Sequence, residues 1–163
     1  MKALVVYDSV FGNTEQIARA IGKALASHID VNILRASDVK PEHLGGLKLL
    51  IVGSPTRQFR PTAAITRFLK GIARDGLNGV SVAVFDTRFK KADIEKTPVL
   101  PFFVKIFGYA AKPMANRLEK KGAELVIPPE GFYVNDTEGP LKEGELERAA
   151  DWAKRIIAEQ ANC

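Results

Sequence analysis

The chain has 163 residues, of which 46% are hydrophobic and 26% charged, with a formal net charge of +5. This size and composition are typical of one globular domain with a real core, and they exclude an intrinsically disordered chain. The apolar runs are far too short to span a membrane, and we expect no signal peptide. The single cysteine, Cys163, permits no internal disulfide, which favours a reducing cytoplasm.

The positive charge allows contact with an acidic protein, a nucleic acid or an anionic surface. The basic residues are mostly scattered, with short clusters at 88–91 and 117–121. No recognition module with interleaved aromatic side chains accompanies them, so we expect no nucleic-acid partner.

Apolar runs alternate with amphipathic stretches along the whole chain. Three nearly continuous apolar runs predict parallel strands that are covered on both faces: 3–7, 47–53 and 80–85. Residues 30–35 alternate between apolar and polar, as expected of an edge strand. A shorter run, 123–127, predicts a fifth strand.

Helical stripes lie between these runs, and each is expected to form core. They cover residues 17–25, 65–72, 104–118 and 146–157. Pro113 either kinks the third helix or starts a second one. In the last helix Leu146 is expected on the buried face and Trp152 at its margin. The predicted fold class is α/β, with one domain over 1–163 and a doubly wound, five-stranded parallel sheet that has helices on both faces.

Ligands of such sheets bind beyond the carboxyl ends of the strands, where the strand order reverses. The first loop there, residues 9–14, reads SVFGNT. Its hydroxyl and amide groups can bond phosphate oxygens, Gly12 allows a close backbone approach, and Thr14 lies at a helix start, where anions are favoured. The alternative is that Ser9, Asn13 and Thr14 only cap the helix.

The composition of the loops excludes several other phosphate sites. A P-loop needs a Gly-Lys-Ser/Thr triplet, and this chain has none. A dinucleotide fingerprint needs three spaced glycines, and the first loop has one. A low-molecular-weight tyrosine phosphatase would need its cysteine in the first loop, whereas Cys163 is the only cysteine of the chain. A phospho-receiver domain would need an aspartate after the third strand, where this chain has GSPT.

The stretch from Val5 to Ile21 resembles the flavodoxin signature. Its slots are filled by Val5, Val6, Tyr7, Ser9, Gly12, Thr14, Ala18 and Ile21. The similarity of layout extends over essentially the whole chain. It includes a fifth strand split into 123–127 and 131–134, which resembles the layout of short-chain flavodoxins. The resemblance implies bound FMN, whose phosphate would contact Ser9, Val10, Phe11, Gly12, Asn13 and Thr14.

The same resemblance implies that the isoalloxazine ring lies between the loops 53–62 and 85–89. The candidate contacts there are Pro55, Thr56, Arg57, Phe59, Asp86, Thr87, Arg88 and Phe89. The two phenylalanines either pack on the ring or belong to the core. The aspartate and the threonine of the second loop either bond the ring edge or ribityl chain, or shape the turn.

Two departures from acidic, electron-carrying flavodoxins bear on the redox chemistry. No glycine lies between Ser54 and Thr62, so a positive φ beside the ring would cost about 1 kcal/mol or more. Arg57, Arg60 and Arg88 lie in or beside the ring loops, where they either favour an anionic flavin or point into water. From these two departures we expect FMN in this protein to populate less semiquinone than in an acidic flavodoxin and to be reduced to the hydroquinone more easily.

We expect an FMN-binding, flavodoxin-like protein that transfers electrons between redox partner proteins, for which an acidic partner fits the net charge. One alternative is an FMN-dependent oxidoreductase acting on a quinone or porphyrinogen-type substrate, with residues 90–113 shaping a pocket. A second alternative is an interaction module without FMN. His28 and His43 stand apart from other ligand types, so we predict no metal site, and no catalytic acid–base pair is apparent.

Overall fold

The computed structural model describes residues 1–57, 60–89 and 109–162. Its strands are β1 (Lys2–Tyr7), β2 (Asp30–Arg35), β3 (Leu49–Pro55), β4 (Ser81–Phe89), β5 (Glu124–Leu125) and β6 (Glu130–Val134). They form one parallel sheet in the order β2-β1-β3-β4-β5, with β6 also paired to β4. β5 pairs with the start of β4 and β6 with its second half. The predicted five-stranded sheet with a split fifth strand is therefore confirmed.

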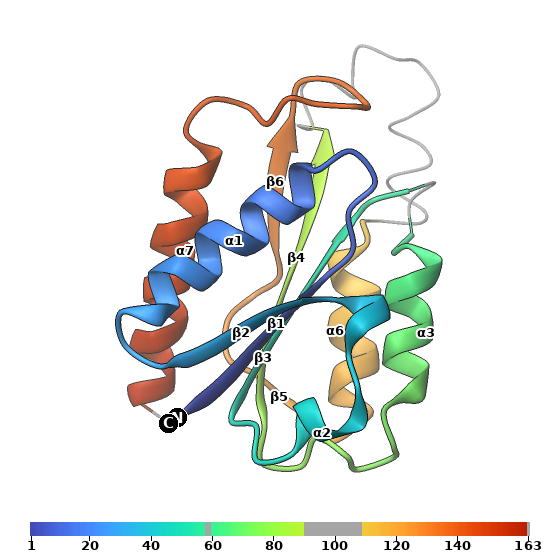
Figure 1. The fold of residues 1–163 in the computed structure, drawn as a ribbon, viewed down its shortest axis with the longest axis vertical. Coiled ribbons are helices and arrows are strands. Elements are labelled where there is room, and N and C mark those ends of the chain that lie inside the picture. The colour runs from blue at the N-terminus through green and yellow to red at the C-terminus, as the bar shows by residue number, and fades with distance from the viewer. Residues whose placement is uncertain (58–59, 90–108, 163) are drawn as a thin grey trace.

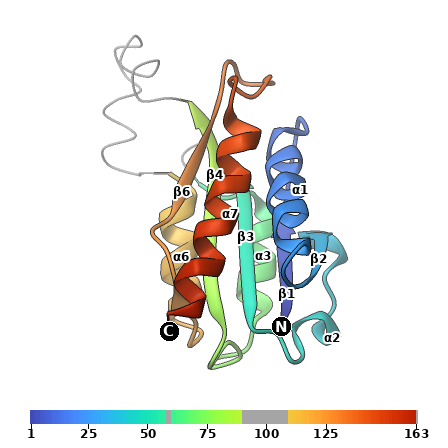
Figure 2. The same cartoon turned by 90° about the vertical axis from the view of Figure 1, so that its left-hand side faces the viewer.

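Helices cover both faces of the sheet. They are α1 (Asn13–Ala26), α2 (Pro41–Leu44), α3 (Ala63–Gly71), α6 (Ala111–Glu119) and α7 (Glu145–Ala161), with a 3-10 turn, η1, at Ala36–Asp38. α1 and α7 lie on one face, and α3 and α6 on the other (Figures 1 and 2). Each layer has its own core because alternate strand residues point to opposite faces. The predicted doubly wound α/β class is confirmed.

The described part of the third predicted helical stretch forms α6. α6 starts at Ala111, and Pro113 is its third residue. Proline is tolerated in the first turn because an N–H there has no acceptor within the helix. Of the two roles considered for Pro113, the structure therefore supports the start of a helix, while Val104 and Phe107 lie outside the described residues.

Most of the predicted buried stripe of the last helix is confirmed, and two positions differ. Leu146 is 41% exposed, so its placement on the buried face was wrong, whereas Trp152 is 2% exposed instead of marginal. The Trp152 ring meets Phe85 and Phe132 edge-to-face, with centroids 6.1 Å away from each. This aromatic cluster fills the space between α7 and the sheet and fixes the rotation of the helix.

The first turn of α7 also carries polar groups to the outer edge of β6. Glu145, the first residue of α7, is 7% exposed. Its Oε2 accepts the Tyr133 N–H at 2.8 Å, and the Arg148 guanidinium donates to the Gly131 carbonyl. The Lys142 N–H donates to the Tyr133 carbonyl at 2.8 Å. The edge strand β6 therefore has hydrogen-bond partners on its outer side.

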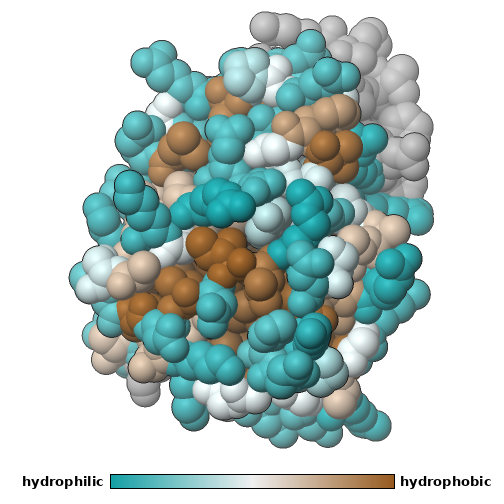
Figure 3. Space-filling model, in the orientation of Figure 1, coloured by the Kyte–Doolittle hydropathy of each residue, from teal (hydrophilic) through white to brown (hydrophobic). Residues whose placement is uncertain are grey.

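The opposite edge is β2, as the alternating pattern predicted. Val31 and Ile33 are half-buried and pack against the core on the α1 side. Apolar side chains show between hydrophilic ones on the face that carries α1 (Figure 3). Within the described ranges, no helix is long and apolar enough to cross a membrane.

We predict that Gly53→Ala destabilises the protein by about 1–3 kcal/mol. Gly53 lies opposite Phe85 in the sheet, and a Cβ at this position would lie 2.0 Å from Cζ of that ring. The aromatic cluster would then have to move. Chemical denaturation gives the free energy of unfolding.

Gly71→Ala is the matched control, because a Cβ there meets nothing within 4 Å. It should leave the stability unchanged or raise it by up to about 1 kcal/mol. Equal stability of the two variants would contradict the packing argument.

Candidate functional site

The loop after β1 leads into a helix without a side-chain cap. Gly12 is the N-cap of α1 with φ 91°, and no side chain caps the helix. The Gly12 N–H donates to Ser9 Oγ at 3.0 Å, so the serine stabilises the loop. The structure thus does not support the interpretation that Ser9, Asn13 and Thr14 only cap this helix. The N–H groups of its first turn have no acceptor within the helix, which leaves them available to an anion.

The polar side chains of this first loop connect it to two other segments. Asn13 and Thr14 are 8% and 1% exposed. Asn13 Nδ2 donates to the Glu138 carbonyl at 3.2 Å, and Thr14 Oγ1 lies 2.8 Å from Thr87 Oγ1. The first loop is therefore held against the end of β4 and against the loop between β6 and α7. Val10 and Phe11, by contrast, are 50% and 43% exposed.

The loop after β3 is attached to β4 and to the start of α6. The Thr56 N–H donates to the Thr87 carbonyl at 3.0 Å, and Thr56 Oγ1 accepts the Ala110 N–H at 3.2 Å. Arg57 and Arg60 exchange two backbone hydrogen bonds of 2.9 Å, and the Arg57 guanidinium lies 5.5 Å from the centroid of the Phe11 ring. These contacts bring the first and second predicted loops together.

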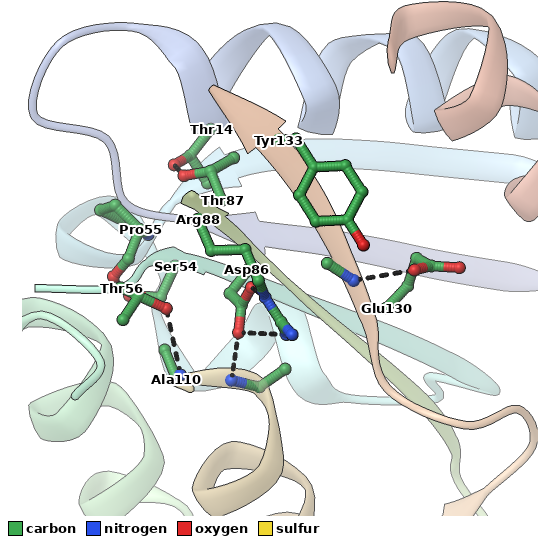
Figure 4. Close-up of polar contacts among 12 residues, drawn as sticks. Thr14, Ser54, Pro55, Thr56, Asp86, Thr87, Arg88, Ala110, Glu130 and Tyr133 are labelled. Carbon is green, nitrogen blue, oxygen red and sulfur yellow. Dashed lines mark hydrogen bonds and ion pairs between the residues drawn. The ribbon is translucent and has the colours of Figure 1, made fainter. Parts of the chain in front are cut away.

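The end of β4 contains a buried ion pair beside these loops (Figure 4). Asp86 is 0% exposed, and its Oδ2 accepts from Arg88 Nη2 at 2.8 Å and from the Ala111 N–H at 2.9 Å. Arg88 Cζ lies 3.8 Å from the centroid of the Tyr109 ring. The aspartate is thus engaged in shaping the end of β4, and the arginine does not point into water.

Burial sets the protonation behaviour of this pair. It raises the pKa of Asp86, while the hydrogen bond and the charge of Arg88 act in the opposite direction. Burial also raises the pKa of Tyr109. The charge of Arg88 is balanced locally by Asp86, so Arg88 contributes less positive field to its surroundings than the sequence suggested.

The predicted site residues that the structure describes lie at the carboxyl edge of the sheet. Pro55 ends β3 and Phe89 ends β4, and both are half-buried. Phe59 lies outside the described residues. Arg35, at the end of β2, was not predicted, although Nη1 donates to the Ser9 carbonyl at 3.0 Å. The sequence signal was available, because parallel pairing places the ends of β1 and β2 side by side.

This fold and edge define a doubly wound α/β protein whose first helix starts without a side-chain cap at the switch point of the sheet. The chain matches the family model of the flavodoxin domain over residues 4–127. It therefore belongs to the flavodoxin family. Among curated protein sequences, none matches it significantly.

Solved structures agree on the fold. A flavodoxin from the domain Archaea aligns with a TM-score of 0.76 and 23% identity, covering 98% of each chain. Flavodoxin 2 of Bacillus cereus, in the oxidised form, aligns with a TM-score of 0.73 and 25% identity, covering 98% of this chain and 99% of that one. The rubredoxin oxygen:oxidoreductase of Desulfovibrio gigas aligns with a TM-score of 0.70 and 18% identity, covering 98% of this chain and 37% of that one.

We predict that Arg88→Gln destabilises the protein by about 3–5 kcal/mol at pH 7, because it leaves the charge of Asp86 buried without a cation. A raised carboxyl pKa means that the stability linked to Asp86 is fully present below the ordinary value of about 3.9 and is lost as the pH rises through the raised value. Without Arg88 this pKa rises further. The destabilisation, measured by urea unfolding at several pH values, should therefore shrink toward pH 4.

The double variant Asp86→Asn/Arg88→Gln should recover most of that loss, because no unpaired charge stays buried. Arg67→Gln, at an exposed position on α3, serves as control and should change stability by less than about 0.5 kcal/mol. A loss in Arg88→Gln that is independent of pH would contradict this account.

Proposed function

We propose that this protein binds FMN through its first loop and carries electrons between redox partners. The observation that supports this most directly is the uncapped start of α1. Backbone N–H groups without an acceptor lie there beside Ser9, Asn13 and Thr14, which are all buried. A phosphate ester matches this donor set, because the helix dipole favours a negative charge and small polar side chains supply further hydrogen bonds.

The ring would lie against the loops after β3 and β4. Pro55 and Thr56 would offer backbone groups to its edge, and Thr87 and Phe89 would border it from β4. When bound, FMN supplies the redox chemistry, while the protein binds it, orients it and sets its potentials. Val10 and Phe11, which are exposed within the first loop, are suited to contact a partner protein.

The charge near this edge favours an acidic partner. Within the described part of the chain, neither Arg57 nor Arg60 has a carboxylate partner. Opposite charges steer two proteins together and fix their orientation more than they add affinity. The oxidoreductase alternative depends on residues 90–113, of which 90–108 lie outside the described residues, and no observation favours it over the carrier.

The first test is purification without added cofactor. We expect a yellow protein whose chromophore, once released, has the mass of FMN. When the apoprotein is titrated with FMN, binding should quench the fluorescence of the flavin with one-to-one stoichiometry. A colourless protein that takes up no FMN would support the interaction module instead, and catalytic turnover of a quinone would favour the oxidoreductase.

The second test is a redox titration of the FMN-loaded protein. We expect its two one-electron potentials to lie close together, because Arg57 and Arg60 favour the anionic, fully reduced flavin. The described residues of the loop after β3 also include none with positive φ. Arg57→Gln/Arg60→Gln should lower the second potential relative to the first. A wide separation in the native protein, seen as a large stable blue intermediate, would contradict the hypothesis.

A further inference from the structure

Arg35 contacts the first loop and the residues on both sides of it. It pairs with Tyr7 in the parallel register of β1 and β2, which places it beside the point where β1 ends. Nη1 donates to the Ser9 carbonyl at 3.0 Å and lies 3.2 Å from Asp8 Oδ1, while Nη2 lies 3.5 Å from Glu15 Oε2. One guanidinium therefore connects the end of the strand, the loop and the first turn of α1.

The two carboxylates beside the loop would repel a phosphate if they were left unpaired. The side chains of Asp8 and Glu15 are 16% and 27% exposed. Arg19 also pairs with Glu15, at 2.8 Å, but it lies on the outer side of α1 with 64% of its side chain exposed. The hydrogen bond from Arg19 is the largest cause that lowers the pKa of Glu15, so this carboxylate stays ionised. Among the described residues, Arg35 is the cation that pairs with Asp8.

We propose that Arg35 is a positioning residue that makes the first loop accept a phosphate ester and so discriminate FMN from riboflavin. It acts in two ways. A Ser9 carbonyl bonded to Arg35 cannot turn toward an anion, and the guanidinium offsets the negative charges of Asp8 and Glu15. The inference rests on the proposed function, because it concerns the same site and the same ligand.

The test compares Arg35→Met with Arg19→Met. Both variants remove a cation that pairs with Glu15, but only the first removes the contacts to Asp8 and Ser9. Apoprotein of each is titrated with FMN and, separately, with riboflavin, following the quenching of flavin fluorescence. Arg35→Met should lower the affinity for FMN about tenfold or more and change the affinity for riboflavin by less than about twofold. Arg19→Met should change the affinity for either flavin by less than about twofold.

Salt and a second substitution separate charge from packing. The loss of FMN affinity in Arg35→Met should shrink as ionic strength rises, because partly exposed charges are screened. Asp8→Asn added to Arg35→Met should restore much of the affinity by removing one uncompensated carboxylate. Arg35→Lys keeps the positive charge but has a single nitrogen donor, so its affinity for FMN should lie between those of Arg35→Met and the native protein. This variant replaces Arg35→Met in the test if Arg35→Met does not fold.

Two failures are distinguishable. A native protein that binds no FMN overturns the proposed function itself. A native protein that binds FMN, together with an Arg35 variant that loses FMN and riboflavin equally or loses neither, overturns the role given to Arg35 and leaves the proposed function standing.

Discussion

The parallel register of β1, β3 and β4 is the constraint on which the whole site depends. It brings three carboxyl ends to one edge, so that loops far apart in the sequence meet there. The Thr14–Thr87 and Thr56–Thr87 hydrogen bonds then join those loops at a single residue of β4. Because Thr87 is held in the sheet, the start of α1 and the loop after β3 are fixed relative to each other.

Much of the fold could be predicted because it follows from periodicity. Continuous apolar runs identified the inner strands, and alternation identified β2 as an edge. Most of the buried stripe of α7 was also predicted, and only Leu146 and Trp152 were misplaced. The burial of Trp152 could not be predicted, since it depends on packing against Phe85 and Phe132, which lie in other elements.

For the candidate site, local composition located the loops but not the partners within them. Asp86 and Arg88 were predicted as separate cofactor contacts, and their ion pair and the bond from Asp86 to the Ala111 N–H were not foreseen. Arg35 escaped notice because it belongs to no motif, and its importance arises from strand pairing. Sequence thus identified where polar groups gather, while pairwise contacts decided which of them remain free to bind a ligand.

The two borders of the sheet differ in how open they are to other chains. On β6, Glu145 and Arg148 occupy backbone groups that an added strand would need. Unpaired borders are the usual starting points for aggregation, so this helix turn acts as a shield against strand addition. Strand addition along β6 would first have to displace Glu145 and Arg148.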